Sequence, residues 1–406
     1  MLKLALRNII RQKIHTTMTL AAIISGVAGI IIAGGWINDI YLQLGEALIR
    51  SQTGHLQVYK QGYFVAGTRS PEKYLIKEPD SVKKQIIEEV GVEKFDIILK
   101  RLNFSGLLNN GRSDLPIIGE GIQPDKEAKL GSSISIIAGR RLTNEDFFGI
   151  MLGKGVAGAL KLKPGDYVTL LTNTLEGALN SLDFEVIGIF QSFSNDYDAR
   201  AIKVPLTAAQ ELLGTQSTNA LVALLKKTED TDNIVAHLAT YLNTAGLEAK
   251  TWIELNDFYE KTVEMYKGQF GVLQIIILLM VLLSVTNSIN MSIFERVGEF
   301  GTMMALGNRS NHISQLILNE SILLGVIGGS FGVGIGSLLA LTISAIGIPM
   351  PPPPNADIGY TAQIQIVPPV LFMAFIIGLS ATVLAALLPA LHVSRIKVVD
   401  ALRQNL

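Results

Sequence analysis

The sequence predicts an α-helical membrane protein with four transmembrane helices and a large extracytoplasmic α+β domain. Four long intervals contain no charged residue, and the segment 38–267, with an ordinary density of charge, separates the first from the second. Of the 406 residues 49% are hydrophobic and only 17% are charged, whereas soluble proteins average about 25% charged residues. The deficit of charge indicates that part of the chain lies in lipid.

The uncharged intervals are long enough to cross a bilayer. A helix rises about 1.5 Å per residue and needs about 20 apolar residues to cross roughly 30 Å of hydrocarbon. Helices buried in soluble proteins rarely contain so many uncharged residues in succession. The uncharged intervals are 16–38, 268–294, 321–355 and 358–391, and the predicted spans are 17–37, 268–292, 318–346 and 368–391.

The first span has the basic flank of a signal peptide and ends in the small residues Ala33, Gly34 and Gly35. Its apolar run is longer than the 7–15 residues typical of a signal peptide. We therefore expect an uncleaved anchor.

Lysine and arginine near the ends of the spans predict the orientation, because cytoplasmic loops are enriched in them. Four precede the first span, two lie between the second and third, three follow the fourth, and 348–367 has none. Both termini are therefore predicted to be cytoplasmic. The predicted segments besides the spans are an amphipathic cytoplasmic helix at 1–16, the extracytoplasmic domain at 38–267, a cytoplasmic loop at 293–317, an outer loop at 347–367 and a cytoplasmic tail at 392–406.

The segment 38–267 reads as a water-soluble α+β domain. It holds 25 basic and 30 acidic residues, so its net charge is 25 − 30 = −5. Its length favours two subdomains. The predicted strands lie at 54–59, 115–121, 167–172, 184–190, 201–204 and 221–225, and the predicted helices at 81–90, 207–213 and 232–245.

Signatures of catalysis and cofactor binding are missing from the sequence. It has no cysteine, its five histidines are scattered, and no Gly-x-Ser-x-Gly elbow joins a predicted strand to a predicted helix. The run 149–155 resembles a phosphate-binding loop but is one residue short and lacks the hydroxyl residue. A formal net charge of −1 argues against nucleic acid as a partner. We therefore expect no catalytic, cofactor or metal site in this chain.

The third predicted span is rich in glycine. Gly328, Gly332 and Gly336 recur every fourth residue, which places them on one helix face and lets a neighbouring backbone approach closely. A nucleotide-binding loop would need a preceding strand and an acidic residue for the ribose. Close helix packing is the preferred interpretation.

The cytoplasmic loop at 293–317 is the strongest candidate for a functional site. Glu295 and Glu299 are four residues apart, and Phe300, Met303 and Met304 form an apolar ridge. Such a short amphipathic helix can dock in a groove of a partner protein. The alternative is a helix that rests on lipid headgroups, which two glutamates make less favourable.

With these features the chain resembles the FtsX-like permeases of ABC transporters, which include MacB-type exporters and the LolC/LolE lipoprotein-release permeases. The loop matches the pattern E-R-x-x-E-x-G-x-x-x-A-x-G. The segment 4–8 is similar to the family's N-terminal helix, and 389–390 with 401–403 is similar to its C-terminal signature, although Val398 stands where proline is common. The residues that match the loop pattern are Glu295, Arg296, Glu299, Gly301, Ala305 and Gly307.

The resemblance implies a non-catalytic permease of the bacterial inner membrane. Two permeases, identical or paralogous, would each receive a cytoplasmic ATPase at the loop, and the ATPase would bind ATP and Mg²⁺. The outer domain would have a porter-like part at 45–105 and 218–265, with a β-rich part inserted at 106–217. The segment 54–59 is most similar to the lipoprotein-release branch. The implied cargo is a lipoprotein or another lipid-like amphiphile lifted from the outer leaflet, with a periplasmic carrier or adaptor as a further partner.

Two other functions fit the same topology. A tripartite efflux permease of the MacB type usually carries an ATPase fused at its N-terminus, whereas sixteen residues precede the first span here. A signal transducer that regulates an outer hydrolase usually has a smaller outer domain. The sequence therefore favours lipoprotein or amphiphile release over both.

Overall fold

The computed structural model describes residues 2–67, 73–351 and 359–393, and it divides into two compact units. The helical unit comprises Met1–Leu42, Thr262–Met350 and Thr361–Leu406, and the α/β unit comprises Gln43–Lys261 and Pro351–Tyr360. Val398 and the predicted C-terminal motif at 401–403 lie outside the described residues.

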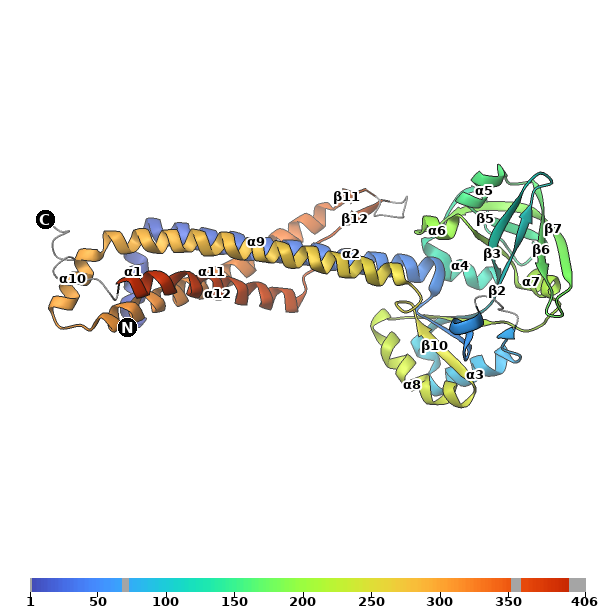
Figure 1. Ribbon diagram of the computed structural model, residues 1–406, viewed down its shortest axis with the longest axis horizontal. Coiled ribbons are helices and arrows are strands. Elements are labelled where there is room, and N and C mark those ends of the chain that lie inside the picture. Colours follow the sequence, from blue (N-terminus) through green and yellow to red (C-terminus); the bar gives the residue numbers. More distant parts are fainter. Residues whose placement is uncertain (1, 68–72, 352–358, 394–406) are drawn as a thin grey trace. The chain divides into compact units, whose positions relative to one another are not determined.

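Four helices are long and apolar enough to cross a membrane, and each predicted span lies within one of them (Figure 1). Helices α2 and α9 extend beyond their uncharged intervals at both ends because backbone hydrogen bonding continues into the polar flanks, whereas α11 ends before its interval does and α12 begins after its interval does. The four helices are α2 (Lys13–Leu48), α9 (Asp257–Glu295), α11 (Ser310–Ile346) and α12 (Pro368–Val393). Two short helices, α1 (Leu2–Arg11) and α10 (Val297–Ala305), and a hairpin of β11 (Ile348–Met350) and β12 (Tyr360–Ala362) complete the helical unit.

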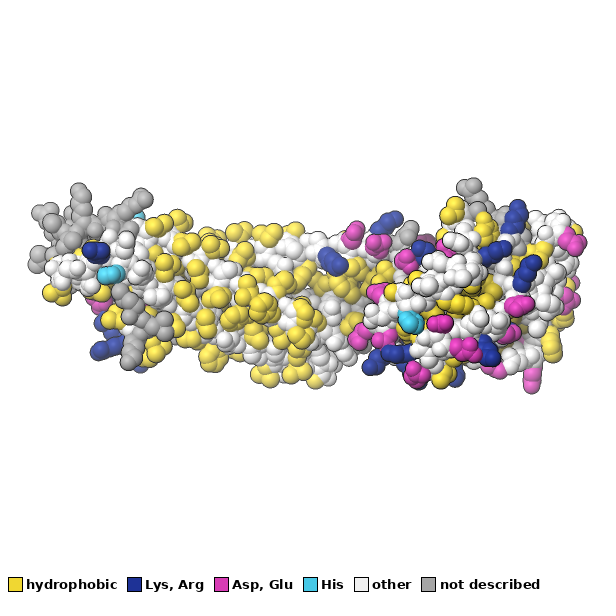
Figure 2. Space-filling model, turned by 90° about the horizontal axis from the view of Figure 1, so that it is seen from below, with side chains coloured by type: hydrophobic (Ala, Val, Ile, Leu, Met, Phe, Trp, Pro, Cys, Tyr) yellow, Lys and Arg dark blue, Asp and Glu magenta, His cyan; other side chains and the backbone are white. Residues whose placement is uncertain are grey.

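The helical unit encloses one apolar core, formed mainly by branched aliphatic and alanine side chains of α2, α9, α11 and α12. Hydrophobic side chains also cover much of the visible outer face of these helices (Figure 2). Large exposed residues include Leu283, Phe331 and Phe372. Exposed apolar surface of this kind matches a lipid solvent.

The α/β unit contains a mixed sheet in the order β10-β1-β9-β2-β3-β8-β5-β7-β4, with β6 paired to both β2 and β7. Six of these strands, β2, β3, β8, β5, β7 and β6, pair in a closed ring, which surrounds an apolar core. The strands are β1 (Leu56–Lys60), β2 (Phe95–Asn109), β3 (Asp114–Ile122), β4 (Ser135–Gly139), β5 (Gly149–Gly153), β6 (Tyr167–Asn173), β7 (Leu179–Gln191), β8 (Ala201–Pro205), β9 (Ala220–Leu225) and β10 (Leu247–Thr251).

The remaining strands form a smaller layered part. Strands β10, β1, β9 and the first half of β2 carry α3 (Pro79–Val90) and α8 (Thr231–Thr244), with a core of their own. Strand β2 belongs to both parts, because its residues 95–101 pair with β9 and its residues 102–109 pair with β3. The boundary predicted between residues 105 and 106 therefore falls inside one continuous strand.

Candidate functional site

Helix α10 connects α9 to α11 and carries the residues that match the loop pattern. The chain leaves α9 at Glu295, turns at Arg296, and leaves α10 through Gly307, whose φ of 94° favours glycine. The amide of Gly307 donates to the Met304 carbonyl at 3.0 Å, and that of Asn308 donates to the Met303 carbonyl at 3.1 Å. Gly307 therefore ends the helix, which is a structural role that the sequence did not predict.

The two faces of α10 differ from the predicted arrangement. Phe300 is fully buried with Val297 in the core of the helical unit, so it cannot belong to a docking ridge. Met303 and Met304 are only partly buried against the same core. Gly301 is also buried, so it does not leave room for a partner. The exposed residues between positions 295 and 306 are Glu295, Glu299, Thr302, Ala305 and Leu306, the last with 82% of its surface exposed.

Arg296 is an internal residue. Its Nη1 donates to Glu320 Oε2 on α11 at 3.0 Å, its Nε lies 3.5 Å from Glu299 Oε2, and its guanidinium lies 4.9 Å from the centre of the Phe300 ring. Glu320 also accepts a hydrogen bond from Asn8 Nδ2 of α1 at 2.7 Å. Because an arginine fork can serve several acceptors at once, Arg296 joins α10 to α11 and, through Glu320, to α1.

Glu295 and Glu299 both contact the N-terminal segment. His15 Nε2 lies 3.0 Å from Glu295 Oε2, and Arg11 forms an ion pair with Glu299. The Glu299 side chain keeps 47% of its surface exposed, and that of Arg11 keeps 58%. The two carboxylates are therefore reachable from outside the chain, but they are already engaged by α1 and the start of α2.

A cavity of about 40 Å³ lies beside these contacts, and the residues that line it include Gln12, Thr19, Ser288, Ser292 and Glu320. Ser292 Oγ donates to Gln12 Oε1 at 2.7 Å, and Thr19 and Ser288 share a hydrogen bond of 2.6 Å. A cavity of this size holds one or two water molecules. This end of the helical unit is thus held together by polar contacts between α1, α2, α9 and α11.

The glycines of α11 lie against α2. A Cβ atom placed on Gly328 would lie 2.9 Å from Ile23, one on Gly332 would lie 2.7 Å from Val27, and one on Gly336 would lie 3.0 Å from the backbone of Ala28. Real Cβ atoms essentially never lie closer than 3.0 Å to another heavy atom, so side chains at Gly328 and Gly332 would force a shift and one at Gly336 would be tightly packed. The two helices therefore approach each other closely along this row of glycines.

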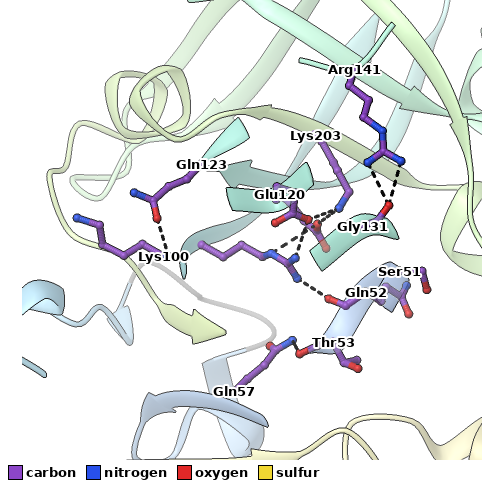
Figure 3. Close-up of polar contacts among 12 residues, drawn as sticks. Ser51, Gln52, Thr53, Gln57, Lys100, Glu120, Gln123, Gly131, Arg141 and Lys203 are labelled. Atoms are coloured by element: carbon purple, nitrogen blue, oxygen red, sulfur yellow. Dashed lines mark hydrogen bonds and ion pairs between the residues drawn. The ribbon is translucent and has the colours of Figure 1, made fainter. Parts of the chain in front are cut away.

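A second polar cluster lies in the α/β unit (Figure 3), and the sequence did not predict it. Arg101 on β2 and Lys203 on β8 are each about 2% exposed, and both contact Glu120 on β3 and Glu127 on α4 (Pro124–Leu130). Lys203 Nζ lies 2.5 Å from Glu127 Oε1, and Arg101 Nη2 lies 2.8 Å from the same oxygen.

The charges of this cluster balance one another. Burial alone would raise the pKa of Glu127, but the charges of Arg101 and Lys203 hold it at about 2. The only sequence signal for the cluster is Lys203, which stands between apolar residues in a predicted strand.

Comparison with known proteins identifies the family. The MacB-like periplasmic core domain matches residues 16–241, which is more than half of the chain, and the FtsX-like permease C-terminal domain matches residues 271–398. The chain belongs to the MacB/FtsX-like ABC transporter permeases. It is therefore a multi-pass membrane protein whose α/β unit is extracytoplasmic.

Three curated relatives illustrate the breadth of the family. The permease is 25% identical to an uncharacterized ABC transporter permease of Methanocaldococcus jannaschii, with 68% of each chain covered. It is 24% identical to the uncharacterized ABC transporter permease YvrN of Bacillus subtilis, with 99% of this chain and 98% of YvrN covered. It is also 24% identical to the macrolide export ATP-binding/permease protein MacB of Hyphomonas neptunium, where 98% of this chain spans only 60% of MacB.

Among solved structures, the periplasmic region of MacB from Actinobacillus actinomycetemcomitans aligns with a TM-score of 0.36 and 15% identity, and covers 53% of this chain and 94% of that one. The extracellular domain of the noncanonic ABC-type transporter YknZ from Gram-positive bacteria aligns with a TM-score of 0.35 and 17% identity, and covers 49% of this chain and 100% of that one.

Proposed function

We propose that this permease receives ATP-driven movement from a separate cytoplasmic ATPase at the exposed face of α10 and passes it to the extracytoplasmic α/β unit. The observation that carries the proposal is the surface formed by Glu299, Thr302, Ala305 and Leu306. Leu306 is largely exposed, and the carboxylate of Glu299 is exposed about two turns before it. An apolar side chain and a carboxylate on one exposed face suit a protein groove with basic or amide donors.

The inner side of α10 suits the transmission of force. Phe300 packs in the core, and Arg296 joins α10 to Glu320 on α11. A push on the exposed face would therefore reach α11 and α1 without first deforming a flexible loop. ATP and Mg²⁺ would be bound by the ATPase, in two copies that serve two permeases, identical or paralogous.

The proposed cargo is a lipoprotein or another lipid-like amphiphile taken from the outer leaflet of the bacterial inner membrane and passed to a periplasmic carrier or adaptor. The four uncharged intervals favour such a cargo over a hydrophilic one, because a path for ions or polar solutes usually needs charged or polar groups within the spans. The close packing of α11 on α2 also leaves little room for a pore between these two helices.

A second candidate function is the export of small amphiphilic molecules with an outer channel partner. The observation that favours it is the match of residues 16–241 to the MacB-like periplasmic core domain, together with the relatives named for macrolide export. Spheroplasts that contain the permease and its ATPase separate the two functions. Appearance of acylated lipoprotein in the soluble fraction supports the first, and efflux of a fluorescent macrolide with lipoprotein retained supports the second.

The docking surface is tested by Leu306→Arg. We expect this change to abolish co-purification of the ATPase, because a buried unpaired charge at an interface is strongly unfavourable. The matched control is Val92→Arg, which changes an exposed apolar residue of the α/β unit and should leave ATPase binding intact. Normal ATPase binding and turnover in Leu306→Arg would show that this face of α10 is not the docking surface.

A further inference from the structure

Helix α1 presents a surface that the proposed function does not use. Ala5 and Ile9 are buried, whereas Ile10 is 65% exposed and Leu6, one turn before it, is also exposed. Arg7 and Arg11, likewise one turn apart, are exposed beside them. The first acidic residue of the chain is Asp39, so no carboxylate from α1 itself balances these cations.

Helix α1 is held firmly in place. Asn8 donates to Glu320 of α11 at 2.7 Å, and Gln12, which follows α1, accepts from Ser292 of α9 at 2.7 Å. The exposed apolar edge and the cationic face are therefore fixed parts of the helical unit. Helix α1 thus has an apolar edge beside two arginines and lies at the cytoplasmic end of a membrane span. This arrangement matches the boundary between acyl chains and anionic headgroups.

Arg11 belongs to this cationic face and also contacts the docking surface. Its partner is Glu299, and both side chains of the pair are about half exposed. Exposed ion pairs of this kind contribute little to stability. A lipid phosphate offers the same guanidinium a bidentate, charge-assisted contact at the membrane surface, so the Arg11–Glu299 pair can be exchanged for an Arg11–phosphate pair.

We propose that anionic lipid headgroups and Glu299 compete for Arg11, so that anionic lipid binds along α1 and releases Glu299 for the ATPase. Binding of the headgroup depends only on α1. The second half of the proposal, release toward the ATPase, rests on the proposed function. Membrane composition would thereby set the strength of coupling between the permease and its ATPase.

Lipid binding can be measured on the permease without any ATPase. Because the chain has no cysteine, an Ile14→Cys variant carries one fluorophore beside α1. The labelled full chain is reconstituted in phosphatidylcholine vesicles that contain either brominated phosphatidylglycerol or brominated phosphatidylcholine. We expect brominated phosphatidylglycerol to quench the fluorophore at a much lower mole fraction than brominated phosphatidylcholine does. Arg7→Gln with Arg11→Gln should reduce this preference by about fivefold for each cation removed.

The matched control is Arg309→Gln, which removes an exposed cytoplasmic cation outside α1 and should leave the preference unchanged. A preference that survives in the double variant would overturn the assignment of the lipid surface to α1. Loss of the preference on addition of inorganic phosphate would assign the cationic face to free phosphate and would overturn a lipid site.

The competition is measured with the permease–ATPase complex in the same vesicles. Phosphatidylglycerol should raise ATPase affinity in the native chain, and Arg11→Gln should give the raised affinity already in pure phosphatidylcholine, because Glu299 has lost its intrachain partner. Anionic lipid that binds α1 but leaves ATPase affinity unchanged would overturn the competition. If Leu306→Arg still bound the ATPase, only the docking site would be disproved, since the quenching measurement does not involve the ATPase.

Discussion

Arg101 Nη1 lies 2.6 Å from the main-chain oxygen of Gln52 and donates a hydrogen bond to it. Gln52 belongs to η1 (Ile49–Thr53), a single π-helical turn that follows α2, and Arg101 lies on the strand shared by both parts of the α/β unit. The same guanidinium contacts Glu127 of α4. The polypeptide that follows α2 is thus tied to the closed ring of strands through one buried side chain.

Replacement of Arg101 should destabilise the α/β unit strongly. Arg101→Met keeps the volume but leaves Glu127 and Glu120 with Lys203 as their only cation, and breaking a buried ion pair costs about 3–5 kcal/mol. Lys94→Met is the control, because the Lys94–Asp230 pair at 2.9 Å is more exposed and should cost less than about 1 kcal/mol. Trp252 fluorescence in a Trp36→Phe background follows urea unfolding, since the chain has only two tryptophans. Equal effects of the two changes would contradict a structural role for the cluster.

The buried position of His55 predicts that the α/β unit loses stability in acid. Its Nδ1 accepts from the Leu225 amide at 3.0 Å, so its Nε2 carries the proton and donates to Thr228 Oγ1, also at 3.0 Å. Burial lowers the pKa of His55 to about 4, against an ordinary value near 6.5. The unfolded chain therefore binds this proton more readily than the folded chain between these two pH values.

Stability of the α/β unit should fall as the pH is lowered from about 6.5 to about 4, by at most about 3 kcal/mol, and should change no further through His55 below that range. The urea midpoint reported by Trp252 measures this loss. His55→Gln should flatten the pH dependence. His237→Gln, a change of an exposed histidine in the same unit, should not. If the urea midpoint of His55→Gln depended on pH as steeply as that of the native chain, the acid sensitivity would belong to other groups.

Two glycines of α11 make a matched test of helix packing. Gly332→Leu should lower the thermal stability of the detergent-purified permease, because the Cβ alone would lie 2.7 Å from Val27. Gly334→Leu should be tolerated, because no atom lies within 4 Å of a Cβ at that position. Size-exclusion chromatography after stepwise heating compares the two. Equal thermal stability of the two variants would mean that α2 and α11 can separate without loss of stability.

Glu299→Lys should weaken ATPase binding and stop transport, because it reverses the charge of the docking surface and places two cations together at Arg11. The double variant Arg11→Glu with Glu299→Lys separates these two effects. It restores an intrachain pair but not a carboxylate at position 299, so ATPase binding should remain weak. Recovery of binding in the double variant would make the intrachain pair, and not a contact with the ATPase, the function of Glu299.

The membrane spans were predictable because the absence of charge over 20 or more residues has few other physical explanations. Helix α7 (Leu206–Leu213) was also predictable, since Gly214 with a φ of 69° ends it. Neither half of β2 was predicted. Residues on both of its faces are buried, so it lacks a clear period of two, and its buried Arg101 resembles a surface residue in the sequence.

The candidate site was only partly predictable for a related reason. A short helix with apolar residues on two sides does not reveal which side packs inward, and here Phe300 packs inward while Leu306 stays exposed. The partners of Glu295, Glu299 and Arg296 come from α1, α2 and α11, which are distant in the sequence. Local spacing therefore located the short helix α10 but not the contacts that restrain it.

The glycines of α11 form two rows, without side chains, on different sides of the helix. Gly328, Gly332 and Gly336 face α2, while Cβ atoms on Gly325 and Gly329 would lie 2.8 Å from Leu379 and Phe375 of α12. Interdigitated side chains resist sliding of one helix along another. The glycine positions of α11 contribute no side chains to such interdigitation. Turning α11 about its axis, in contrast, would drive bulkier neighbouring residues into both partners. The packing on these two faces therefore opposes rotation of α11 about its axis more than displacement along that axis.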